Sequence, residues 1–331
     1  MDFRPGDWVE VKSAEEIAAT LDENGALGGL PFMPEMIPYC GKRLKFARQI
    51  RKTCIEQPVG RFLIRELIPD DVVILEEARC SGADHGGCQR DCSILWKTAW
   101  LRPVDDRQQG LRTSNSQLLL SKLKTMSVLN RYYCQSTELV KLVYPDTMGP
   151  LKVLAQCVQD LLSGAVSFFE MIPMVCVPLY RKLRDRLVGR PALVGTLKRT
   201  PVGDLNLQPG ELVTVKSVEE IRATLDSKGR NRGLVCDIES TVFCGKQFRV
   251  RGRLDRMISE PTGEMKRVEA TVLLEGQNCL CARALGGCPR KEFAYWREVW
   301  LKRVEPSSSL PPAMTSGRVG ISESVAEPIA K

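Results

Sequence analysis

Two stretches of this chain are near-copies of each other: Pro5-Gly6-Asp7-Trp8-Val9-Glu10-Val11-Lys12-Ser13 and Pro209-Gly210-Glu211-Leu212-Val213-Thr214-Val215-Lys216-Ser217. The similarity continues over residues 5–104 and 209–304, and it includes Cys40-Gly41-Lys42 with Cys244-Gly245-Lys246 and Gly86-Gly87-Cys88 with Gly286-Gly287-Cys288. Self-similarity at a nearly constant offset indicates an internal repeat. We therefore expect a duplicated domain, in which residue types kept by both copies serve the shared architecture.

The 331 residues accommodate two such repeats and a separate segment between them. Leucines and valines at helical spacing follow the first repeat, and Ser, Pro and small residues dominate the C-terminal stretch. We expect repeat 1 over 1–104, a polar linker over 105–117, a helical insert over 118–200, repeat 2 over 205–305 and a disordered tail over 306–331.

Each copy opens with signals for a strand and then a short helix. Trp8, Val9 and Val11 are strand formers after a Pro-Gly turn. Ser13 and Glu16 then have the spacing of a capping box, as do their counterparts in repeat 2. Further short strands follow, so the predicted class is α+β, a tandem duplication of a small, strongly bent sheet or barrel-like domain with a cysteine cluster. The opening strand resembles that of SH3-like and KOW-type barrels, and this resemblance implies an SH3-like barrel.

The matched tryptophans near the end of each copy are Trp96, Trp100, Trp296 and Trp300. The two tryptophans of a pair are four residues apart, and this spacing puts both rings on one face of a strand or of a helix. Periodicity therefore does not decide between a strand and a helix. We expect them in the core. Base stacking or peptide recognition is the alternative, which would make them binding residues.

Cysteine usage favours an intracellular protein with metal or redox chemistry. The chain has 13 cysteines, and Met1 leads directly into a charged strand pattern without the features of a secretion signal. Reducing conditions in the cytosol disfavour structural disulfides. We therefore predict a cytoplasmic location, and metal ligation or thiol chemistry for the cysteines.

The cysteines kept in both copies predict a zinc site. The expected ligands are Cys40, Cys80, Cys88 and Cys92 in copy one and Cys244, Cys279 and Cys288 in copy two. Further candidate ligands are Cys54, His85, Cys281 and Glu292, the last of which stands in the place of Cys92. An iron–sulfur cluster, reversible disulfide chemistry and simple burial of the thiols are the alternatives.

The segment 161–180 is apolar, contains one charged residue, Glu170, and is followed by a basic run. Its length would suit a membrane span. Pro173, Pro178 and Gly164 oppose a span, because they break or weaken helices. We therefore expect a buried insert helix or helical hairpin and no transmembrane span, with peripheral membrane contact through 161–190 as an alternative.

No phosphate-binding glycine loop, nucleophile elbow or metalloprotease helix occurs in the sequence, and His85 is its only histidine. No catalytic residue can be assigned. Leu285 stands where His85 would fall in copy two, which predicts that the fold does not need an imidazole there. The leading hypothesis is a non-enzymatic, metal-stabilised binding or assembly factor, whose two modules engage a protein partner. The alternatives are a redox or sulfur-handling enzyme that uses the thiols and His85 of copy one, and a nucleic-acid-binding protein.

Overall fold

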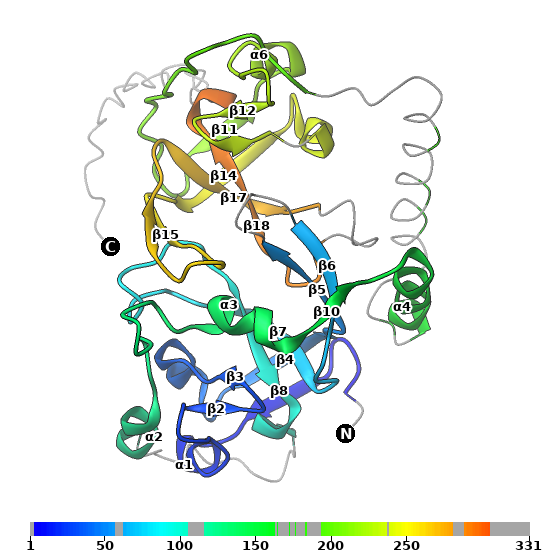
Figure 1. Cartoon of the computed structure of the whole chain (residues 1–331), viewed down its shortest axis with the longest axis vertical. Coiled ribbons are helices and arrows are strands. Elements are labelled where there is room, and N and C mark those ends of the chain that lie inside the picture. The colour runs from blue at the N-terminus through cyan, green and yellow to red at the C-terminus, as the bar shows by residue number, and fades with distance from the viewer. Residues whose placement is uncertain are drawn as a thin grey trace, which may run out of the picture.

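The computed structural model describes residues 3–56, 62–104, 116–162, 193–236, 238–280 and 288–304, together with residues 164, 172, 176 and 183. The fold is mixed α+β, with mostly antiparallel sheets and few helices. The N-terminal half (blue to cyan) lies at the bottom of Figure 1, and the C-terminal half (yellow to orange) lies at the top. The predicted α+β class is thereby confirmed.

Two five-stranded sheets have the same strand order. The first runs β8-β7-β4-β1-β9, formed by Ser93–Lys97, Val72–Arg79, Arg43–Gln49, Trp8–Val11 and Leu101–Pro103. The second runs β18-β17-β14-β11-β19, formed by Phe293–Arg297, Thr271–Asn278, Gln247–Arg253, Leu212–Val215 and Leu301–Arg303. We call the part of the chain around each sheet a module. The predicted strand at the start of each copy is confirmed, and further strands follow it in both copies.

The register of the two sheets agrees as well. Val9 faces Leu44 and Val11 faces Leu101, while the matching Val213 faces Phe248 and Val215 faces Leu301. Because side chains alternate between the faces of a strand, equal register places matching residues on the same face of each sheet. Capping boxes begin helices α1, Ala14–Ala18, and α6, Val218–Arg222, as predicted.

Smaller elements surround the two sheets. In the first module they are β2 (Ala26–Leu27), β3 (Leu30–Pro31), the 3₁₀ helices η1 (Pro34–Tyr39) and η2 (Thr98–Trp100), β5 (Lys52–Glu56) and β6 (Phe62–Leu67). In the second they are β12 (Arg230–Asn231), β13 (Leu234–Val235), η4 (Ile238–Phe243), β15 (Arg256–Ile258), β16 (Met265–Arg267) and η5 (Glu298–Trp300). The described part of the insert holds α2 (Gln117–Lys122), α3 (Gln135–Glu138), η3 (Leu139–Leu142), β10 (Val143–Thr147) and α4 (Pro150–Leu162).

The described insert is not purely helical. Strand β10 pairs with β6 and extends the β5-β6 hairpin into a three-stranded sheet. In Figure 1 this sheet lies between the two modules, with α4 to its right. The predicted linker up to residue 115, the tail from 306 and most of the segment 161–190 lie outside the described residues. Of the helices that the structure describes, none combines the length and the apolar character needed to cross a membrane.

Each module has its own tryptophan core. Trp96 lies in strand β8 and Trp100 lies in the 3₁₀ helix η2. The two tryptophans of a pair therefore lie in a strand and in a helical turn, and not in one element as their spacing allowed. All four matched tryptophans are fully buried. Trp100 Nε1 donates to Thr20 Oγ1 at 3.1 Å, and Trp300 Nε1 donates to Thr224 Oγ1 at 3.0 Å. Buried indoles with a hydrogen-bond partner are structural, and their rings are not available to a base or a peptide.

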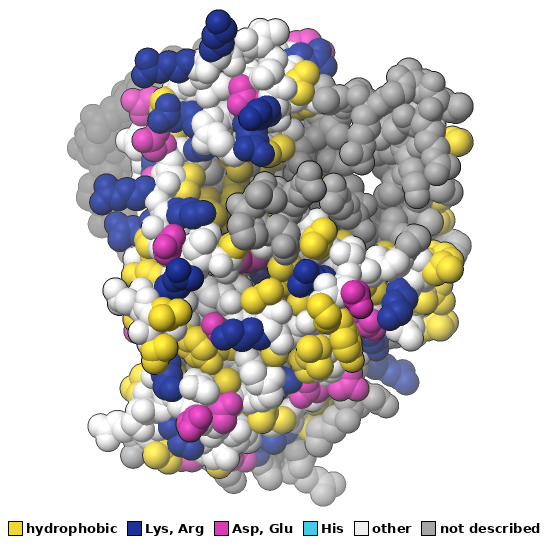
Figure 2. All heavy atoms as spheres, in the orientation of Figure 1, with side chains coloured by type: hydrophobic (Ala, Val, Ile, Leu, Met, Phe, Trp, Pro, Cys, Tyr) yellow, Lys and Arg dark blue, Asp and Glu magenta, His cyan; other side chains and the backbone are white. Residues whose placement is uncertain are grey.

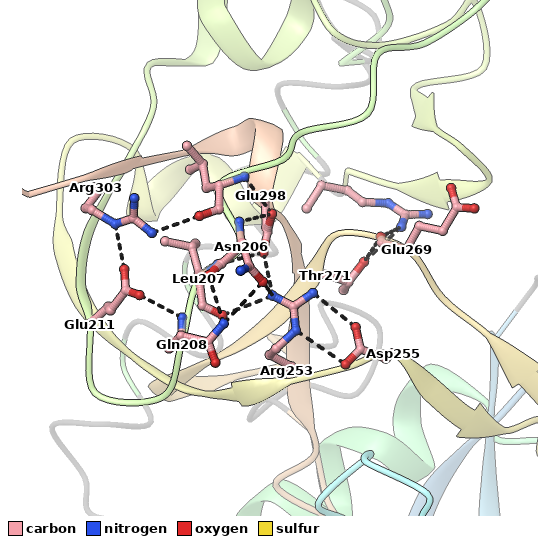
Figure 3. A network of polar contacts seen from close by, with 12 residues as sticks. Asn206, Leu207, Gln208, Glu211, Arg253, Asp255, Glu269, Thr271, Glu298 and Arg303 are labelled. Atoms are coloured by element: carbon pink, nitrogen blue, oxygen red, sulfur yellow. Dashed lines mark hydrogen bonds and ion pairs between the residues drawn. The ribbon is translucent and has the colours of Figure 1, made fainter.

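A buried carboxylate attaches the chain that leaves the insert to the second module (Figure 3). Glu298 accepts hydrogen bonds from the backbone N–H groups of Leu205, Asn206 and Leu207, at 2.9, 3.1 and 3.0 Å. Arg253 completes the arrangement with an ion pair of 3.1 Å to Glu298 and a second contact to Asp255. A buried carboxylate needs such partners, and here they fix the end of the insert to the second sheet.

Candidate functional site

Four of the predicted site residues of copy one, namely Cys80, His85, Cys88 and Cys92, line a cavity of about 30 Å³ where the two modules meet. Its wall comes from Met33, from the loop 80–92 with strand β8, from the segment 134–139 of the insert and from the second module. Side chains in that wall include Cys80, Cys88, Cys92, Cys134, Arg290 and Glu292. Such a volume holds about one water molecule, whereas pockets for organic ligands span hundreds of cubic ångströms. The cavity is therefore too small to be a substrate pocket.

Glycines allow the loop 80–92 to fold tightly. The Cys80 N–H donates to the Cys92 carbonyl at 2.9 Å and closes the loop. Gly82 has φ +65°, and a Cβ there would lie 2.0 Å from the Cys88 carbonyl oxygen. A Cβ on Gly86 would lie 2.2 Å from Tyr132 Oη of the insert. Only glycine fits these positions, since the backbone is left-handed and the neighbours are in contact.

His85 and Glu35 form a buried ion pair inside this loop. His85 Nδ1 lies 2.7 Å from Glu35 Oε1, His85 Nε2 lies 3.0 Å from the Tyr133 carbonyl, and each of the two side chains is 1 % exposed. Both partners are acceptors, so both ring nitrogens must carry protons. Burial alone would lower the pKa of His85, but the hydrogen bond to Glu35 and its charge outweigh burial and raise it.

The imidazolium corrects two interpretations of the sequence. With both nitrogens donating, His85 has no lone pair with which to activate a thiol or bind a metal. It instead joins η1, the loop 80–92 and the insert. The expectation that the fold does not need this imidazole is wrong for the first module, because Glu35 would remain buried without its counter-charge.

The predicted metal site is wrong for the described residues. Among these, no group of three or more His, Cys, Asp and Glu side chains is arranged to hold a metal ion. The Ile258 N–H donates to Cys88 Sγ, and Cys92 Sγ lies 3.7 Å from Ser136 Oγ. Burial raises the pKa of the Cys80 and Cys92 thiols. A zinc site needs thiolates that converge on one point, and an iron–sulfur cluster would need the same.

The other predicted ligands are separated from this group or paired otherwise. Cys40 caps η1 and lies near Glu15, which adds to the effect of burial and raises the pKa of its thiol to about 11. Cys244 has the same place in the second module, near Glu219. Cys54 is buried in a separate apolar cluster with Ile64, Met148 and Val153. Cys281 lies outside the described residues.

A cluster of buried charges joins the two modules, and the sequence analysis missed it. Arg90 Nη2 and Arg290 Nη1 both bind Glu260 Oε1, at 2.8 and 2.9 Å. Burial would raise the pKa of Glu260, but the two guanidinium groups outweigh it and lower the pKa. One feature of the sequence could have indicated this cluster: Arg90 and Arg290 each follow a matched cysteine, Cys88 or Cys288, by two residues.

Arg79 bridges matching positions of the two modules. Its Nη1 donates to the Asp91 carbonyl at 2.8 Å and its Nη2 to the Lys291 carbonyl at 2.9 Å. Asp91 and Lys291 have matching left-handed backbones, with φ 51° and 50°. We call the contacts of Arg79, Arg90, Arg290 and Glu260 the charged joint. The charged joint fixes the modules to each other by hydrogen bonds to matching positions in both copies, such as Asp91 and Lys291.

Glu292, which replaces Cys92, lies beside the joint. Arg290 Nη1 is 3.8 Å from its Oε1, and neither carboxylate oxygen has a hydrogen-bond partner within the described structure. A buried carboxylate facing a water-sized cavity is suited to accept from a water molecule. This residue therefore serves the packing of the joint and does not act as a metal ligand among the described groups.

Cys279 and Cys288 of the second module are brought together as a pair. The Cys288 N–H donates to the Cys279 carbonyl at 3.1 Å. A hydrogen bond from Cys279 lowers the pKa of the Cys288 thiol to about 7 against the effect of burial, with help from the charge of Arg290. This shift is opposite to that of the Cys80 and Cys92 thiols. No such difference could be read from the spacing of the cysteines.

Comparison with models of protein families, with curated proteins and with solved structures finds no match.

Proposed function

We propose that this protein is a non-enzymatic binding or assembly factor, in which two duplicated SH3-like modules are held rigidly and the insert presents an apolar face to a protein partner. The equal strand order and equal register of the two sheets support the duplication. The charged joint supports the rigidity. The observation that carries the proposal is the outer surface of helix α4.

Helix α4 has two apolar faces. Val153 and Cys157 are buried on its inner face, where Val153 packs with Cys54 and Ile64 of β5 and β6. Its outer face carries residues spaced three and four apart, which line up on a helix. These are Leu151, Leu154, Val158 and Leu162, with exposed fractions of 80, 44, 45 and 80 %. We call these four residues the α4 stripe.

The apolar surface extends beyond the helix. Val140, Tyr144 and Ile68 are also exposed, and they come from η3, from β10 and from the end of β6. Figure 2 shows hydrophobic side chains (yellow) over α4 at the right and nearer the middle of the molecule, with charged side chains between the two groups. Single exposed apolar residues are ordinary, but a group of them favours an interaction surface.

The charges of α4 favour a protein partner over a membrane or a nucleic acid. Between Pro150 and Leu162 the helix carries Lys152 and Asp160, with no net charge. Helices that lie on membranes are rich in Lys and Arg on their polar face. Nucleic-acid surfaces need a cluster of the same residues. A neutral stripe of leucine and valine instead suits the apolar face of another protein.

The positions of the reactive groups support a binding function over catalysis in the first module. His85 uses both ring nitrogens in hydrogen bonds, and burial raises the pKa of the Cys80 and Cys92 thiols. General bases and nucleophiles need a free lone pair or a thiolate near neutral pH.

Leu154→Asp and Val158→Asp should each weaken partner binding at least about tenfold, because a carboxylate in an apolar contact loses its water without gaining a partner. The thermal midpoint should stay within a few degrees of wild type, since both side chains are already exposed. The measurement is quantitative capture of partners from nuclease-treated cell extract, with the tagged full-length chain as bait. Gln159→Asp, on the same helix but outside the stripe, is the matched control.

Three outcomes would contradict this function. Capture of a partner only from extract that has not been treated with nuclease would indicate nucleic-acid binding. Flotation of the wild-type chain with vesicles of phosphatidylserine and phosphatidylcholine, abolished by Leu154→Asp, would indicate a membrane surface. Self-association of the purified chain that Val158→Asp abolishes, measured by light scattering, would show that a second copy covers the stripe.

A further inference from the structure

Cys279 and Cys288 lie side by side in the second module. Cys279 directly follows β17, and its N–H donates to the Glu292 carbonyl at 2.7 Å. The Cys288 N–H donates a hydrogen bond to the Cys279 carbonyl at 3.1 Å. The Cys288 carbonyl accepts one from the Lys291 N–H at 3.0 Å. The hydrogen bond from the Cys288 N–H to the Cys279 carbonyl holds the two backbones in contact, as a disulfide between these residues would require.

The two thiols also contact each other. The Cys279 thiol donates a hydrogen bond to the Cys288 sulfur, and the Arg290 guanidinium adds positive charge nearby. Both effects favour the thiolate of Cys288 against its burial, so that its pKa falls to about 7. A thiolate beside a thiol donor is the arrangement in which one sulfur attacks and the other resolves.

The matching cysteines of the first module have different surroundings. Cys88 Sγ accepts the N–H of Ile258 across the joint, and burial raises the pKa of Cys80. The loop between them is also anchored by the ion pair of His85 with Glu35, whereas copy two has Leu285 at the place of His85. Cys80 and Cys88 are therefore packed separately in the first module, whereas the matching Cys279 and Cys288 contact each other in the second.

We propose that Cys279 and Cys288 form a reversible dithiol–disulfide site that is oxidised by hydrogen peroxide. The Cys288 thiolate attacks one peroxide oxygen, the O–O bond breaks, and with one proton the departing hydroxide becomes water. Cys288 is then a sulfenic acid. The sulfur of Cys279 attacks the Cys288 sulfur, and the hydroxyl leaves as a second water with the proton of the Cys279 thiol. The two sulfurs have lost two electrons, peroxide has gained them, and a dithiol reductant reverses the change.

This inference is independent of the partner-binding function. It assigns the thiol chemistry to the second module, whereas the sequence pointed to the first. Cys279 is half-buried and Cys288 is buried, so a small oxidant such as peroxide is better suited to reach the pair than a bulky thiol reagent, which should react with Cys279 first.

The test treats the full-length protein with hydrogen peroxide, alkylates the remaining thiols under denaturing conditions and maps tryptic peptides by mass spectrometry. Cleavage after Arg283 separates Cys279 and Cys281 from Cys288, so the disulfide links peptide 268–283 to peptide 284–290. We expect this cross-link to form and to disappear with dithiothreitol. Cys80 and Cys88 share the peptide 80–90 and form the internal control, which should remain alkylated.

Variants decide which sulfur is involved. Cys281→Ser should keep the cross-link, and Cys279→Ser should lose it and leave Cys288 as a sulfenic acid that a dimedone probe traps. At pH 7 Cys288 should react at least about tenfold faster than Cys80, because the reactive species is the thiolate. The proposal is overturned if Cys281 is the partner of Cys288, if peptide 80–90 is oxidised first, or if the pair stays reduced while the protein remains folded.

Discussion

Glu260→Ala is expected to destabilise the protein by about 3–5 kcal/mol, which is a large part of the stability of an average domain. Glu260 is the shared counter-ion of Arg90 and Arg290, at 2.8 and 2.9 Å, and all three side chains are buried. Alanine would leave Arg90 without its ion-pair partner and Arg290 with only the more distant Glu292, at 3.8 Å. The desolvation of the two arginines would then be poorly compensated, and the two modules would separate or unfold.

The measurement is urea unfolding followed by tryptophan fluorescence, which reports on both buried tryptophan cores. Glu264→Ala is the matched control, because Glu264 is exposed on the same part of the chain and its loss should change stability by no more than about 0.5 kcal/mol. A variant with Arg90→Met, Glu260→Leu, Arg290→Met and Glu292→Leu together should recover most of the loss, since these four buried positions then carry no charge to desolvate. An equal loss in Glu260→Ala and Glu264→Ala would contradict the structural role of the joint.

His85→Ala is expected to cost about 3–5 kcal/mol at pH 6, because it removes one partner of a buried ion pair and leaves Glu35 charged in the core. The pKa of His85 is raised above its ordinary 6.5, so its contribution is complete below that pH and is lost as the pH rises through the folded-state value. The pKa of Glu35 is lowered below 4.5 against the effect of burial, so its contribution is complete above that pH and is lost on acidification.

The difference in unfolding free energy between wild type and His85→Ala should thus be largest between pH 4.5 and 6.5 and shrink on either side. Asp84→Asn is the control, since it keeps the backbone N–H that donates to Glu35 and removes only an exposed charge, whose effect on the pKa of His85 is smaller than that of Glu35. His85→Leu with Glu35→Leu should be more stable than His85→Ala alone. A loss that stays constant from pH 4 to 9 would show that packing of the ring, and not its charge, is what matters.

The repeat in the sequence predicted much of the local structure. The capping boxes at Ser13 and Ser217, the strands that follow each Pro-Gly turn and the burial of the matched tryptophans depend on residues close together in the chain. Local hydrogen bonds and hydrophobic alternation determine such features, so a single sequence carries them. The two sheets then have the same strand order because the same pattern is present twice.

The sequence by itself determined which residue types the two modules share, but only the tertiary structure decided what those residues do. Cys40 and Cys88 match cysteines in copy two, yet one thiol lies near Glu15 and the other accepts an N–H from Ile258. The partners that decide each role, such as Glu260 for Arg90, come from parts of the chain that are distant in sequence. Spacing fixes how far residues can reach, whereas burial and charge at their final positions fix protonation and pairing. For this reason the thiols predicted to converge on a metal are instead divided between a packed joint in one module and a contacting pair in the other.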